Sequence, residues 1–93
     1  MCKVITAKKV SPTPATETVI FNKREERRES GIAEFKVRAY TVEAAFTAPP
    51  CPALVLEAQA KAGLPFDRHS IYPETLQGQM AGGVYVARWK CRA

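Results

Sequence analysis

The chain has 93 residues, a length that suits one domain rather than two. Hydrophobic residues make up 46% and charged residues 25%, a balance that excludes general disorder. No stretch is long and apolar enough to span a membrane, so we expect no membrane partner. The formal net charge of +5 favours an anionic partner. The partner is expected to be an acidic protein surface, or a nucleoprotein complex in which this protein contacts the guide RNA or DNA.

Three extended segments are predicted in the first half of the chain. β-Branched and aromatic residues indicate strands at residues 2–10 and Thr18–Phe21, with a proline-rich loop between them. The charged run Lys23–Glu29 is predicted as an exposed connection, and a short helix is the alternative. A third strand is expected from Ile32 to about Tyr40, and residues 41–47 either extend it or begin a helical turn.

One helix and one further confident strand are predicted in the second half. Proline at the first helical turn and Gly63 after the last one delimit a helix from Pro52 to Ala62. A short strand is expected around residues 69–72, followed by a loop from Pro73 to Gly83. The glycine pair at the end of that loop provides a turn into the last strand, Val84–Arg92.

This order of elements predicts the fold class. One helix after three strands argues against alternating strand–helix–strand units. We expect a single α+β domain over residues 1–93, with a small antiparallel or mixed sheet of four to five strands and one main helix packed on one face. The other face of the sheet then remains exposed.

Two of the predicted strands alternate apolar and cationic residues. Side chains on a strand point to opposite faces in turn, so Lys36 and Arg38 oppose Val37, and Arg88 and Lys90 oppose Trp89. Trp89 is accordingly expected in the core. If the two strands are neighbours, their cations form a basic sheet face whose predicted partner-binding residues are Lys36, Arg38, Tyr40, Arg88, Lys90 and Arg92. The competing interpretation is a solvated face whose charges prevent aggregation.

The charged run offers a second set of candidate contacts. Arg24, Arg27 and Arg28 are predicted to bind an acidic partner. The glutamates among them cancel much of their charge, so a solvated segment of mixed charge is the favoured interpretation.

The chain also contains residue types that occur in metal sites and catalytic sites. Cys2, Cys51, Cys91 and His69 are the ligand types of a zinc site, and Cys51 with His69 and Asp67 has the residue types of a nucleophilic catalytic group. Neither set has the spacing of a known motif, so we expect no metal, no cofactor and no enzymatic activity. Three scattered cysteines do not resemble a disulfide framework, which favours a reducing, cytoplasmic setting.

A resemblance to known proteins rests on overall character. The strand Ala33–Tyr40 followed by the alanine-rich helix Ala53–Ala62, in a compact single domain, resembles the small anti-defence proteins of phages and mobile elements, the anti-CRISPR proteins in particular. The resemblance covers the whole chain and includes no shared motif, so no functional residue is carried over. It implies a stoichiometric inhibitor that occupies a nucleic-acid-binding surface of a host complex, in the host cytoplasm. Many such inhibitors are acidic, whereas this chain is basic.

The sequence therefore predicts a non-enzymatic binding protein that uses a basic sheet face. The alternative is a structural or assembly subunit without nucleic-acid contact, such as a homodimer formed through an open sheet edge or through Trp89.

Overall fold

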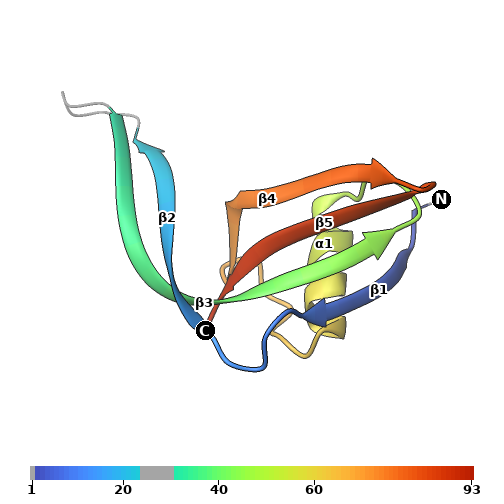
Figure 1. The fold of residues 1–93 in the computed structure, drawn as a ribbon, viewed down its shortest axis with the longest axis horizontal. Coiled ribbons are helices and arrows are strands. Elements are labelled where there is room, and N and C mark those ends of the chain that lie inside the picture. Colours follow the sequence, from blue (N-terminus) through green and yellow to red (C-terminus); the bar gives the residue numbers. More distant parts are fainter. Residues whose placement is uncertain (1, 24–30) are drawn as a thin grey trace.

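The computed structural model describes residues 2–23 and 31–93, with side chains described at residues 2–18 and 36–93. Within these residues, one helix covers one face of a five-stranded antiparallel sheet (Figure 1). The elements in chain order are β1 (Val4–Lys9), β2 (Ala15–Lys23), β3 (Gly31–Phe46), α1 (Pro52–Lys61), β4 (Ile71–Ala81) and β5 (Val84–Arg92). The predicted α+β fold is confirmed. In the described part of the chain, no helix is long and apolar enough to cross a membrane.

The long strand β3 organises the sheet. Its second half lies between β1 and β5, and β4 follows β5 at the sheet edge. Its first half pairs with β2 along residues 31–39. Figure 1 shows β3 bending sharply where its partners change, so that β2 and residues 31–39 project as a two-stranded arm. We call this hairpin the arm. Residues 41–47, which the sequence left open between strand and helix, mostly continue β3.

The segment Pro73–Gly83 is not the predicted loop, because most of it forms β4. Gly82 and Gly83 have φ values of 58° and 85°, which suits the two-residue turn of a tight hairpin with β5. The ladder is irregular only between Tyr72 and Gln77. There the Thr75 hydroxyl accepts a hydrogen bond from the Lys90 backbone N–H at 2.8 Å. Hairpin pairing outweighs the low strand preference of Pro73 and Gly78 in this segment.

The core lies between the sheet and α1. Its buried residues are Val42, Ala44, Phe46, Val55, Ala58, Ala87, Trp89 and Cys91. Register places Val42 of β3 directly opposite Trp89 of β5, so the two large side chains share the face that α1 covers. Trp89 is only 1% exposed, which confirms its predicted core position.

Gln59 of α1 is a fully buried polar residue that the sequence analysis did not single out. Its Oε1 accepts a hydrogen bond from the Trp89 indole N–H at 2.9 Å. Its Nε2 donates to the Pro65 carbonyl, also at 2.9 Å. Both halves of the amide are therefore satisfied, and the side chain joins α1 to β5 and to the loop that follows the helix.

Candidate interface on the open face of the sheet

The sheet surface that points away from α1 is the candidate functional site, and we call it the open face. Strand alternation and register assign its residues, because directly opposed residues of antiparallel strands point to the same side. Its central residues are Thr6, Lys8, Thr41, Glu43, Ala45, Gln77, Gln79, Val86, Arg88 and Lys90. They come from β1, β3, β4 and β5, so the surface extends across the whole body of the sheet.

The structure brings β3 and β5 together as predicted, but it does not bring their cations onto one face. Arg92 pairs with Ala39 and Lys90 pairs with Thr41, so both cations lie with the odd-numbered residues of β3. Lys36 and Arg38 are even-numbered and point to the opposite side. The single face of five cations is therefore wrong.

The physical reason is that the pattern of apolar residues along β3 changes from odd-numbered to even-numbered positions. In the arm, the apolar residues of β3 after Ile32 are odd-numbered, and Ala39 is buried. In the body of the sheet the buried positions are even-numbered, beginning with Val42. The strand bends between these halves, where its partner changes from β2 to β1 and β5 (Figure 1).

The remaining predicted residues of β3 also lie away from the open face. Lys36 and Arg38 are exposed on the arm, opposite Thr18 and Thr16 of β2. Tyr40 points to the same side as Val42 and is partly buried. The Lys9 ammonium lies 4.9 Å from the centre of the Tyr40 ring, a cation–π contact. Arg24, Arg27 and Arg28 are outside the described residues.

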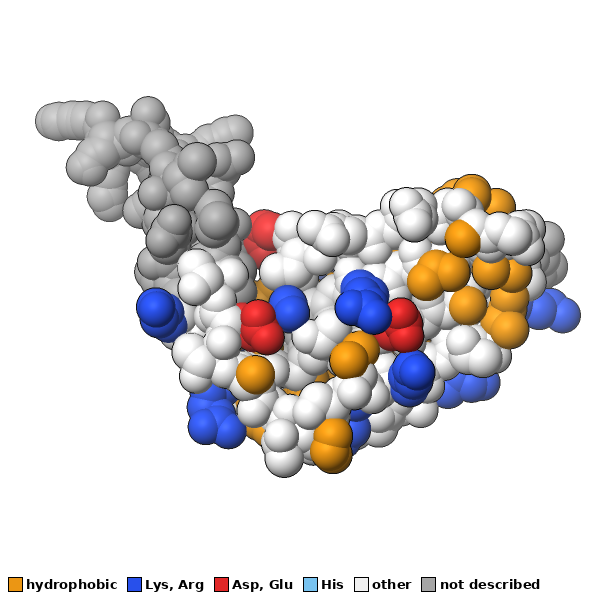
Figure 2. Space-filling view, in the orientation of Figure 1, with side chains coloured by type: hydrophobic (Ala, Val, Ile, Leu, Met, Phe, Trp, Pro, Cys, Tyr) orange, Lys and Arg blue, Asp and Glu red, His pale blue; other side chains and the backbone are white. Residues whose placement is uncertain are grey.

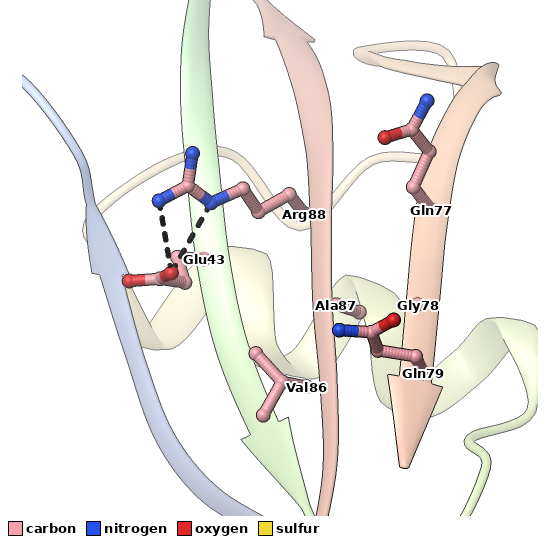
Figure 3. A pocket seen from close by; sticks show the side chains of 7 residues that line it. All are labelled: Glu43, Gln77, Gly78, Gln79, Val86, Ala87 and Arg88. Atoms are coloured by element: carbon pink, nitrogen blue, oxygen red, sulfur yellow. Dashed lines mark hydrogen bonds and ion pairs between the residues drawn. The ribbon is translucent and has the colours of Figure 1, made fainter. Parts of the chain in front are cut away.

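Three of the cations that lie on the open face, Lys8, Arg88 and Lys90, are held by acidic residues of the same chain. Glu43 contacts Arg88 at 3.1 Å (Figure 3). The same carboxylate lies 3.7 Å from the Lys8 ammonium. The Lys90 ammonium lies 3.4 Å from the Glu17 carboxylate and donates to the Thr41 hydroxyl at 2.8 Å. Figure 2 accordingly shows basic and acidic side chains next to each other on this side of the molecule.

Arg92 completes the positive residues of this surface. Its guanidinium lies 5.8 Å from the centre of the Tyr72 ring. Among the residues whose side chains are described, four cations, Lys8, Arg88, Lys90 and Arg92, thus share the open face with three acidic residues, Glu17, Glu43 and Glu74. The excess is one positive charge, so the open face is mixed in charge rather than basic.

Three adjoining hollows shape this surface. One of about 370 Å³ lies beside Gln77, Gln79 and Arg88 (Figure 3). A second of about 420 Å³ lies between β1 and β3, and shares Glu43 and Val86 with the first. A third of about 410 Å³ lies where β2 approaches β4 and shares Gln77 and Arg88 with the first. The shared lining residues place the three hollows next to one another on this face.

The hairpin end of the open face is apolar. Val86 lies opposite Ala45, and Val84 and Ala81 follow at the turn. Ile5 of β1 is 46% exposed and points away from the core-facing Val4. Figure 2 shows hydrophobic side chains gathered at this end of the molecule. The face therefore combines a charged, polar centre with an apolar end.

The cysteines occupy three different environments. The Cys2 thiol donates to the Ala48 carbonyl at 3.0 Å, Cys51 is exposed before α1, and Cys91 is buried in the core. Burial raises the pKa of the Cys91 thiol, and the neighbouring Arg92 opposes that shift. The Asp67 carboxylate accepts a hydrogen bond from the His69 backbone N–H. Among the described residues, no three His, Cys, Asp or Glu side chains are grouped so that they could hold a metal ion.

Comparisons with known proteins found no matching family model, no similar curated protein and no similar solved structure. The resemblance to anti-CRISPR proteins stays a prediction from the overall character of the sequence.

Proposed function

We propose that the protein is a non-enzymatic binding protein that binds its partner through the open face. The observation that carries this proposal is the arrangement of that face, which has adjoining hollows, paired charges at its centre and apolar residues at one end. The Lys90 ammonium is held by both Glu17 and Thr41, so its position is fixed before binding. Fixed polar groups lose little conformational freedom when a partner docks.

The mixed charge favours a protein partner over direct contact with nucleic acid. A phosphate backbone approaching Arg88 or Lys90 would also meet Glu43 and Glu17, whose carboxylates repel it. A protein surface can place its own acidic and basic groups against this pattern and cover the apolar end. The resemblance to anti-CRISPR proteins supports a more specific form of the proposal, in which the protein is a stoichiometric inhibitor that binds a protein subunit of a host nucleoprotein complex.

Capture of the partner from host lysate, with and without nuclease, tests this function. The open-face variant is Arg88→Glu with Lys90→Glu, and the matched control is Lys36→Glu with Arg38→Glu on the arm. Both variants change the charge by the same amount. We expect the first to lose capture and the second to retain it. Nuclease treatment should leave capture unchanged. Loss of capture only in the arm variant, or only after nuclease treatment, would refute the proposal.

A variant that keeps the ion pairs separates binding from stability. Val86→Arg places a bulky side chain between the hollows without removing a partner from Glu43 or Glu17. We expect it to abolish capture while the fluorescence of buried Trp89 stays that of the wild type. Salt adds a second readout. Affinity for a protein partner should fall less than about tenfold between about 50 and 200 mM salt, whereas six or more phosphate contacts would lose about a thousandfold.

A further inference from the structure

The outer edge of β4 supports an inference that is independent of the open face. β4 lies at the edge of the sheet, and the neighbour along its second half is β5. Residues 76–81 are exposed, and Leu76 and Met80 are 39% and 56% exposed. We infer that this edge pairs with the same edge of a second copy of the chain, so that two sheets join into one.

The second half of β4 lacks the features that protect natural sheet edges. Such edges carry lysine, proline or an irregular ladder, each of which prevents pairing with another strand. The opposite edge, β1, contains Lys8 and Lys9. The first half of β4 contains Pro73 and Glu74 and the irregularity of the ladder. Residues 76–81, Leu-Gln-Gly-Gln-Met-Ala, contain no lysine and no proline, and their pairing with β5 is regular from Gln77 onward.

The hairpin turn determines which backbone groups point outward. Positive φ at both turn glycines identifies a two-residue turn whose closing pair, Ala81 and Val84, is hydrogen-bonded. Hydrogen-bonded pairs alternate along an antiparallel ladder, so Gln79 and Gln77 also direct their backbone groups toward β5. The N–H and C=O groups of Leu76, Gly78 and Met80 therefore point away from the sheet.

A second copy fits this edge because the segment is complementary to itself. In a two-fold antiparallel pairing centred on Gly78, Leu76 faces Met80 of the second copy, and Gln77 faces Gln79. The two exposed apolar side chains then cover each other, and the glutamine amides meet on the other face. No residue from 76 to 81 is charged, so no like charges meet across the two-fold axis.

The centre of this pairing is a glycine for a structural reason. A Cβ on Gly78 would collide with the ring of Tyr85, which lies against the Gly78 backbone on the side of α1. The Tyr85 ring thus covers the backbone of Gly78 in the place that a side chain would otherwise fill. Across the two-fold axis, Leu76 pairs with Met80, Gly78 with Gly78, and Met80 with Leu76. Each pair forms two backbone hydrogen bonds, which gives about six between the two copies.

Sedimentation equilibrium over a concentration series tests the inference. We expect the wild type to rise reversibly from the monomer mass toward twice that mass. Met80→Lys places a charge on the edge without touching the core or the open face, and should weaken dimerisation by at least about tenfold. The matched control is Ile5→Lys, an exposed apolar residue of the opposite edge strand, which should change dimerisation less than about twofold.

Amide hydrogen exchange identifies the edge that pairs. On dimerisation the amides of Gly78 and Met80 should become protected by at least about tenfold, while those of Gln77 and Gln79 are already protected by β5. A protein that stays monomeric at every concentration overturns the inference. So does a dimer that Met80→Lys leaves intact, or one in which Gly78 and Met80 gain no protection. Each of these outcomes leaves the proposed open-face function standing, because Met80 lies on the other side of the sheet.

Discussion

Replacing Gln59 with leucine gives a quantitative test of how α1 is fixed to the sheet. Gln59→Leu keeps the approximate volume of the side chain but removes both of its hydrogen bonds. The indole N–H of Trp89, only 1% exposed, is then left without an acceptor. Pro65 is exposed, so water can replace the lost donor at its carbonyl. The penalty therefore comes mainly from Trp89, about 1–3 kcal/mol for one unsatisfied buried donor.

Urea unfolding followed by fluorescence measures this loss, because Trp89 is the single tryptophan of the chain. We expect the free energy of unfolding to fall by about 1–3 kcal/mol. Gln79→Leu, at an exposed glutamine of β4, is the matched control and should change it by less than about 0.5 kcal/mol.

A double-mutant cycle with Trp89→Phe isolates the bond itself. Phenylalanine has no N–H to leave unsatisfied, so Gln59→Leu should destabilise the Trp89→Phe background by about 1 kcal/mol less than it destabilises the wild type. The fluorescence probe is lost in that background, and far-ultraviolet circular dichroism replaces it. A Gln59→Leu variant within about 0.5 kcal/mol of the wild type, with no coupling in the cycle, would show that the buried hydrogen bond is not what fixes the helix.

Three further predictions concern β4 and the cysteines. Gly78→Ala should lower the free energy of unfolding by about 1–3 kcal/mol in urea titrations, because its Cβ meets the Tyr85 ring, and Tyr85→Leu should remove most of that difference. A thiol reagent should modify Cys51 in the native protein, but Cys91 only after unfolding. Because burial raises the pKa of the Cys91 thiol, the unfolded chain releases this proton at lower pH than the native protein does. Stability should therefore fall as pH rises above the ordinary thiol pKa, and Cys91→Ala should show a smaller decline.

Local signals predicted most elements of the fold. Pro52 marks the start of α1, and Gly63, with a φ of 89°, follows its end as the sequence indicated. The alternation of Val84–Arg92 predicted β5 and the buried position of Trp89. The start of β4 was expected, but its continuation after Tyr72 was missed. Proline and glycine have low strand propensity, and the pairing of this part depends on the neighbouring strand rather than on its own residues.

The candidate site was only partly predictable, because it depends on register. Alternation assigns two sides to each strand but does not say which sides of two strands coincide. One signal was available. Apart from Ile32 and Ala45, the apolar residues of β3 are odd-numbered up to Ala39 and even-numbered from Val42. This change marks the bend between the arm and the body of the sheet. The pairing of Lys90 with Glu17 joins residues far apart in the chain, so no local pattern indicated it.

The net charge of the chain and the shape of the open face contribute differently to binding. Residues 23–34 contain four cations and four acidic residues, so they add nothing to the net charge of +5. The open face contributes one positive charge, from four cations and three acidic residues. Six cations and two acidic residues remain elsewhere, including Lys36 and Arg38 on the arm. Most of the positive charge therefore lies away from the paired charges of the open face. From there it can accelerate the approach of an acidic partner through long-range attraction, while the paired charges and the apolar end of the open face determine which partner fits.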